Sequence, residues 1–167
     1  MSKERLYIFD TTLREGAHTQ GVHFSLDEKI KIANALDNLG VDYIEGGWPG
    51  ANPTDTEFFQ KNLKLKNSKF TAFGMTKKSG RSADNDPGLS ALLNSNTSSV
   101  CVVGKSWDFH VDVALGIAKE ENIENIIETT KHFVKNNKEF LFDAEHFFDG
   151  YKANQKYALD CVKAAYD

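Results

Sequence analysis

Residues 9–16 read Phe-Asp-Thr-Thr-Leu-Arg-Glu-Gly, which places an arginine and a carboxylate directly after a short apolar run, Leu6 to Phe9. The pattern predicts a β-strand that ends on chemically active side chains. The guanidinium of Arg14 is a permanently charged fork of donors for a carboxylate or an enolate oxygen, and Glu15 can ligate a hard divalent cation. A solvated Arg-Glu pair in a loop is the simpler interpretation of so short a motif.

A second apolar run ends in a similar way. Residues 41–50 read Val-Asp-Tyr-Ile-Glu-Gly-Gly-Trp-Pro-Gly, so this run ends on Glu45 and a loop rich in glycine and proline. In a parallel β/α architecture the loops after the strand ends open on one face of the sheet. We therefore expect Arg14, Glu15 and Glu45 to converge there, which favours a functional site over a solvated pair.

Short apolar runs alternate with segments of helical period along the rest of the chain, a pattern typical of a parallel sheet built from βα units. The predicted strands lie near residues 5–10, 41–46, 69–74, 98–104 and 138–143. The predicted helices lie near residues 25–39, 54–65, 86–94, 108–119, 123–136 and 154–166. Ser25 and Glu28 have the spacing of a capping box, and Gly40 has the place of a C-terminal cap. A single domain is the simplest organisation.

Composition indicates a soluble cytoplasmic protein. The 167 residues carry a net charge of -4 without a basic patch, which argues against binding to nucleic acid. No apolar run approaches the length of a membrane span, and the N-terminus lacks the apolar region of a secretory signal. Cys101 and Cys161 fit neither a disulfide framework nor a paired metal motif, so a reducing compartment is expected.

The motif at residues 10–16, Lys29 downstream and Glu45 after the second strand resemble a family of metal-dependent Claisen-condensing enzymes. This family includes the 2-isopropylmalate, homocitrate and citramalate synthases together with hydroxymethylglutaryl-CoA lyase. Residues 44–53, 104–110 and 142–150 are most similar to the citramalate synthases among them. The resemblance implies an acyltransferase that condenses acetyl-CoA with a 2-oxo acid, pyruvate in that case, in branched-chain amino-acid biosynthesis. A 2-isopropylmalate or homocitrate synthase, or a lyase of the same family, is an alternative.

The resemblance also implies a fold, a TIM (β/α)₈ barrel of the pyruvate carboxyltransferase type. Such a barrel needs eight strands and about 250 residues, whereas residues 1–167 hold about five βα units. We therefore expect a partial barrel, the N-terminal portion of a truncated catalytic domain. The family's His-x-His metal pair would lie on a later strand. An inactive half-barrel that only binds or assembles is the alternative for this chain alone, whereas a full-length protein is expected to be a homo-oligomer.

Roles for individual residues follow from the resemblance. It implies that Glu15 ligates a Mg or Mn cation, that Arg14 neutralises the keto oxygen during condensation, and that Glu45 holds Arg14 in place. His18 stands where the family usually has a glutamine that binds substrate; an ordinary polar loop residue is the simpler interpretation. Glu145 matches a family glutamate that lines the keto-acid pocket, although an exposed loop carboxylate is favoured from sequence alone.

Two lysines are interpreted more modestly. Lys29 falls at the family's spacing but lies on the first predicted helix, so we expect a surface or helix-packing residue. Lys105 follows the fourth predicted strand and could face an acidic ligand, but a solvated side chain is the default expectation. The base that would remove a proton from acetyl-CoA cannot be assigned to any residue of this chain.

Overall fold

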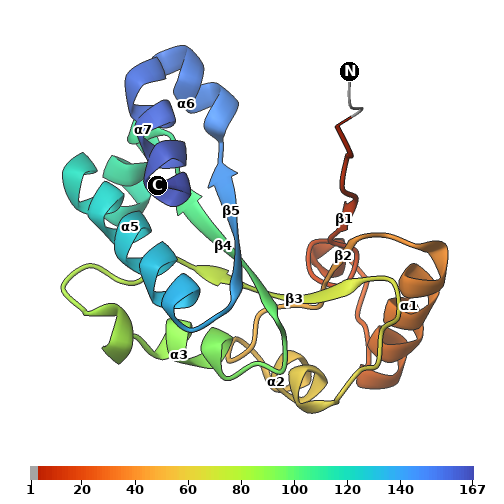
Figure 1. The fold of residues 1–167 in the computed structure, drawn as a ribbon. Coiled ribbons are helices and arrows are strands. Elements are labelled where there is room, and N and C mark those ends of the chain that lie inside the picture. Colours follow the sequence, from red (N-terminus) through yellow and green to blue (C-terminus); the bar gives the residue numbers. More distant parts are fainter. Residues whose placement is uncertain (1–3) are drawn as a thin grey trace. The chain divides into compact units, whose positions relative to one another are not determined.

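The computed structural model describes residues 4–167, and Figure 1 shows its strands and helices. The strands are β1 (Phe9–Asp10), β2 (Tyr43–Glu45), β3 (Lys69–Met75), β4 (Ser99–Lys105) and β5 (Glu139–Glu145). They form a five-stranded sheet in the order β1-β2-β3-β4-β5, and β2 pairs in parallel with both β1 and β3. A strand order that follows the sequence is that of a β/α barrel, because a doubly wound sheet reverses its order at a switch point. The partial barrel is thus confirmed in its strands.

The helices are α1 (Leu26–Leu39), α2 (Pro53–Gln60), α3 (Pro87–Leu93), α4 (Asp108–His110), α5 (Lys119–Lys135), α6 (Phe147–Ala153) and α7 (Gln155–Tyr166). The predicted capping box of α1 is confirmed, since the Ser25 hydroxyl accepts from the backbone N–H of Glu28 and the Glu28 carboxylate accepts from that of Ser25. Gly40 ends this helix with φ 86°, a conformation that costs glycine little.

Two predicted element boundaries were wrong in the first 65 residues of the chain. The strand expected over residues 5–10 forms a ladder only at Phe9–Asp10, because the N–H of Ile8 bonds to the side chain of Asp42 instead of a ladder carbonyl. The helix expected to reach residue 65 ends at Gln60, and the extended segment after it lets Leu63 and Leu65 pack on the core.

Further differences lie in the second half of the chain. The helix expected over residues 108–119 is the short α4 followed by a π-helical turn, Val111–Leu115, that ends at Gly116. The next helix, α5, begins at Lys119 rather than near residue 123, and α6 was not predicted. Strand β5 extends to Glu145, so this carboxylate ends a strand rather than lying in a loop.

The chain divides into two compact units. The first runs to Phe73 and includes Ser95–Ser99; the second comprises Gly74–Asn94 and Val100–Asp167. The core of the first unit contains the buried side chains Leu13, Ala33, Val41, Ile44 and Phe58. The core of the second contains Val111, Ile126, Tyr157 and Cys161. Among residues 4–167, no helix combines the length and the apolar character needed to span a bilayer.

Asp37 is a buried carboxylate that joins α1 to the segment before β3. It accepts hydrogen bonds from the backbone N–H groups of Lys66, Asn67 and Ser68, at 2.8–3.1 Å. Burial by itself raises the pKa of Asp37, but these three N–H donors outweigh burial and hold the pKa below its ordinary value. The ionised side chain therefore fixes the backbone that leads into β3.

Replacing Asp37 by alanine should lower the free energy of unfolding by about 2–4 kcal/mol at pH 7, because three backbone N–H donors lose a charged acceptor that is itself buried. The folded-state pKa is lowered, so the stabilisation is present above about pH 4 and is lost as the pH falls through the folded-state pKa. Urea denaturation from pH 7 to pH 3 should therefore show the wild type and Asp37→Ala converging in acid. Asp27→Asn, on the exposed face of α1, is the control and should cost less than about 1 kcal/mol. A pH-independent difference would contradict the assignment.

Candidate active site

The segment after β1 folds into a tight turn that presents Arg14. The carboxylate of Asp10 accepts from the backbone N–H and the hydroxyl of Thr12, and the carbonyl of Thr11 accepts from the N–H groups of Arg14 and Glu15. Leu13 is fully buried in the core of the first unit and anchors the turn. A 3₁₀ turn, Gly16–His18, follows. Arg14 therefore leaves a short and internally bonded segment at the carboxyl end of β1.

Arg14 makes the contacts that the two strand ends predicted. Its Nε donates to Oε2 of Glu45 at 2.5 Å, and its Nη1 donates to Oε2 of Glu15 at 2.6 Å. Its guanidinium carbon lies 3.7 Å from the ring centroid of Phe73 in β3, a cation–π arrangement. The expected convergence of Arg14, Glu15 and Glu45 is therefore observed, and Phe73 joins them.

The two carboxylates beside Arg14 differ in exposure. The side chain of Glu45 is 1% exposed, whereas that of Glu15 is 58% exposed. A carboxylate as buried as Glu45 needs a charged partner, while an exposed one can meet a ligand from solvent. The geometry thus suits Glu45 to holding the guanidinium and Glu15 to facing outward.

His18 lies at the edge of the same cluster. Its Nδ1 is 3.6 Å from Oε2 of Glu15, and its side chain is exposed. Within residues 4–167, no three His, Cys, Asp or Glu side chains are grouped so that they could hold a metal ion. Glu15 and His18 do not by themselves make a cation site, because divalent cations such as Mg²⁺ require about six oxygen ligands. Within the described residues Glu15 therefore remains a single candidate ligand, and the family's His-x-His pair would lie on a later strand.

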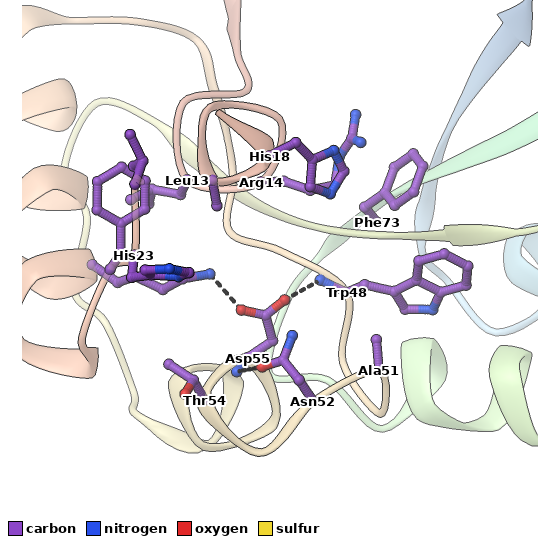
Figure 2. A pocket seen from close by; sticks show the side chains of 14 residues that line it. Leu13, Arg14, His18, His23, Trp48, Ala51, Asn52, Thr54, Asp55 and Phe73 are labelled. Carbon is purple, nitrogen blue, oxygen red and sulfur yellow. Dashed lines mark hydrogen bonds and ion pairs between the residues drawn. The ribbon is translucent and has the colours of Figure 1, made fainter. Parts of the chain in front are cut away.

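A cavity of about 500 Å³ opens beside Arg14 in the first unit. Figure 2 shows its lining, which includes Arg14, His18, Trp48, Asp55 and Phe73. The walls are partly aromatic, and the ionisable side chains are Arg14, His18, His23 and the buried Lys29–Asp55 ion pair. Such a lining suits a small organic ligand that carries an acid group.

That ion pair joins Lys29 of α1 to Asp55 of α2. Lys29 is 4% exposed, so it is not a surface residue, and its contact with α2 agrees with the alternative expectation of helix packing. Its side chain also lines the cavity. Asn52 caps α2 directly before Asp55, since its side chain accepts from the N–H of Asp55 at 2.8 Å. The sequence shows Lys29 at the family's spacing and Asp55 in an Asn-Pro-Thr-Asp segment, but it gives no sign that these two residues, 26 positions apart, form an ion pair.

Glu145 belongs to the second unit, where its own neighbours define its setting. It forms an ion pair with Lys105, the last residue of β4, and its backbone carbonyl accepts from the N–H of Ser106 at 3.2 Å. The side chains of Lys105 and Glu145 are 17% and 33% exposed. The sequence favoured a solvated Lys105 and an exposed loop carboxylate at Glu145. Both expectations were wrong, because Lys105 pairs with Glu145 and Glu145 ends β5.

The end of β4 is held by residues that sequence reasoning did not select. The carbonyl of Lys105 accepts from Nδ2 of Asn122 at 2.9 Å and lies 3.6 Å from the Cys161 thiol. Asn122 also donates to the Tyr157 hydroxyl at 2.8 Å. Burial raises the pKa of Tyr157 and raises the pKa of the Cys161 thiol to about 11, so both groups are protonated at neutral pH. Within residues 4–167, neither Cys101 nor Cys161 is part of a disulfide.

Solved structures share this fold at low sequence identity. A hydroxymethylglutaryl-CoA lyase from Bacillus subtilis aligns with a TM-score of 0.73 and 16% identity, over 97% of this chain and 54% of that one. The lyase from Pseudomonas aeruginosa aligns with a TM-score of 0.70 and 15% identity, over 96% of this chain and 55% of that one. These similarities concern the fold alone and agree with a partial (β/α)₈ barrel.

Curated sequences are closer. An (R)-citramalate synthase of Aquifex aeolicus is 51% identical over 97% of this chain and 31% of its own length. The (R)-citramalate synthase of Geobacter sulfurreducens is 46% identical over 100% of this chain and 32% of its own length. A 2-isopropylmalate synthase of Caldanaerobacter subterraneus is 35% identical over 87% of this chain and 36% of its own length. The chain thus spans about a third of the length of the curated relatives that it matches. The family model described as HMGL-like matches residues 5–167, and this chain therefore belongs to the HMGL-like family.

Proposed function

We propose that this chain forms part of the active site of a synthase that condenses acetyl-CoA with pyruvate to give (R)-citramalate and CoA. The observation that carries the proposal is the Arg14 guanidinium, clamped by buried Glu45 at the carboxyl end of β1 in a chain 51% identical to a citramalate synthase. Pyruvate is favoured over a bulkier 2-oxo acid because the 2-isopropylmalate synthases are more distant, at 27–35% identity.

In this reaction the methyl carbon of acetyl-CoA loses a proton and attacks the keto carbon of pyruvate. The keto oxygen becomes an alkoxide and takes up a proton, and water then cleaves the thioester and releases the CoA thiol. Within residues 4–167, the contacts of Arg14 engage Nε and Nη1, which leaves the donors of Nη2 for the developing oxyanion. A fixed donor aimed at developing charge is often the largest single contribution to catalysis.

The remaining roles are assigned by chemistry and by the family. Glu45 holds Arg14, and Glu15 would contribute one ligand to a Mg or Mn cation, which would polarise the keto group as a Lewis acid. Glu145, paired with Lys105, would orient the substrate or pass on a proton, and His18 at the cavity edge would bind the substrate. Acetyl-CoA and the 2-oxo acid would be the partners of the complete enzyme.

Arg14→Lys should lower turnover by roughly 10²–10³-fold, because lysine keeps the charge but loses the planar fork that binds Glu45 and the oxyanion together. The test protein is a chimera in which this chain replaces the matching 31% of the Aquifex aeolicus synthase. Turnover is followed as pyruvate-dependent thiol release. Arg81→Lys, an exposed arginine, is the matched control and should leave turnover unchanged. Full activity in Arg14→Lys would remove Arg14 from the mechanism, and an inactive parent chimera would refute the proposed function.

Glu15→Gln should weaken the binding of Mn²⁺ by at least about tenfold, because the substitution removes a ligand charge while nearly preserving shape. Calorimetric titration of the same chimera measures this without relying on activity. Glu120→Gln changes an exposed glutamate in the first turn of α5 and serves as the control. Equal Mn²⁺ affinities for the parent and Glu15→Gln would exclude Glu15 as a ligand.

The 167-residue chain by itself should show no pyruvate-dependent release of CoA, even with added Mg²⁺ or Mn²⁺. Its described residues do not group three metal-ligating side chains, and a partial sheet leaves the polarised carbonyl in bulk water, where electrostatic stabilisation is weak. The measurement is thiol release with and without pyruvate, with Arg14→Ala as the blank. Release by the wild type alone would mean that five βα units suffice for catalysis.

A further inference from the structure

We propose that Lys29 and Asp55 are positioning residues, which hold Arg14 in its working orientation through the backbone of the loop between β2 and α2. This inference rests on the role proposed for Arg14. Neither residue touches Arg14 in the contacts described above. Both act on the segment Gly46–Trp48, which follows Glu45 directly.

The first step is the burial of Lys29. A lysine that is 4% exposed needs hydrogen-bond acceptors inside the protein. Its Nζ donates to the carbonyl of Gly46 at 2.9 Å and forms the ion pair with Asp55. Lys29 is on α1, so these contacts tie the helix to the first residue after Glu45.

The second step is the other carboxylate oxygen of Asp55. It accepts from the backbone N–H of Trp48 at 2.9 Å, as Figure 2 shows. Between these two anchor points, Gly47 has φ 139°, and a Cβ there would lie 2.5 Å from the Asp55 carboxylate. The carboxylate is therefore seated directly against the loop backbone, and only glycine fits at that point.

Two routes then lead from this loop to Arg14. Along the backbone, the Gly46 carbonyl fixes the residue next to Glu45, whose carboxylate accepts from Arg14 Nε. Through the rings, Trp48 packs edge-on against Phe73 at 5.6 Å between centroids, and Phe73 carries the Arg14 guanidinium on its ring. Both supports of Arg14 thus depend on a loop whose helix side is held by Lys29 and Asp55.

The side of the loop that faces β3 has its own hydrogen bonds. The N–H of Gly46 donates to the Thr71 carbonyl at 3.0 Å, and the N–H of Phe73 donates to the Gly47 carbonyl at 2.9 Å. Loss of the ion pair should therefore loosen the loop without detaching it from the sheet. Loss of the ion pair should therefore change the orientation of Arg14 while the fold is kept, as expected for positioning residues rather than purely structural ones.

The first experiment reads the Arg14 side chain directly. In ¹H–¹⁵N spectra of the 167-residue chain, the Arg14 Nε–H should exchange slowly with solvent because it is bonded to buried Glu45. Lys29→Met should speed this exchange by roughly 2–30-fold, the range for substitutions along a coupled network. Lys31→Met, the same change at an exposed site on α1, should leave it as in the wild type.

A double variant, Lys29→Met with Asp55→Leu, guards against loss of folding. Lys29→Met alone leaves a buried carboxylate without its cation, whereas removing both charges with apolar residues of similar size is often tolerated. The double variant should melt close to the wild type yet keep fast Arg14 exchange, because the Gly46 carbonyl and the Trp48 N–H still lack their partners. If Arg14 exchange returns to the wild-type rate together with the melting temperature, the proposal is wrong.

The second experiment uses the chimera with the Aquifex aeolicus synthase. Misplacing a catalytic group by about 1 Å can cost about 10²-fold in rate, so the double variant should lose about that factor in kcat while KM for pyruvate changes little. Wild-type kcat in the double variant would also overturn the proposal. An inactive unsubstituted chimera would instead refute the proposed function, and the exchange rates would still decide whether Lys29 governs Arg14.

Discussion

The carboxylate of Glu45 lies in the interior of the first unit, where an isolated negative charge would be far more costly than in water. Arg14 supplies the compensating charge, and it can do so only if the turn after β1 brings it across the end of β2. The fold of that turn, the packing of Leu13 beneath it and the ring of Phe73 against the guanidinium all serve this contact. The geometry of the cavity beside Arg14 depends on this ion pair between Arg14 and Glu45.

A second buried ion pair, Lys29 with Asp55, lies in the same unit. Buried pairs of this kind seldom add net stability, because the desolvation of two ions offsets much of their attraction, and apolar replacements are often neutral. Two such pairs around one cavity are better understood as a means of fixing orientation. Apolar packing tolerates small shifts of the backbone, whereas a lysine bonded to both a carbonyl and a carboxylate allows few alternatives.

The sequence was sufficient for those features that depend on local pattern. Alternating apolar runs predicted the five strands, the Ser25–Glu28 pair predicted the start of α1, and two strands ending on charged residues predicted that Arg14 meets Glu45. Features that depend on distant residues were missed. Lys29 was expected at the surface or in helix packing, but its partner Asp55, 26 residues away, could not be identified. A solvated side chain was the default expectation for Lys105, whose partner Glu145 lies 40 residues away. Sequence periodicity indicates which face of a helix is apolar, but it does not identify a charged partner on another element of the fold.

Cys161 illustrates how a fold sets the reactivity of a side chain. Its thiol is buried beside the carbonyl of Lys105, and its pKa is raised to about 11. At neutral pH about one molecule in 10⁴ would carry the thiolate, which is the form that oxidants and electrophiles attack. The end of β4, and the Lys105–Glu145 pair on it, is therefore supported by a buried thiol whose raised pKa disfavours the reactive thiolate form.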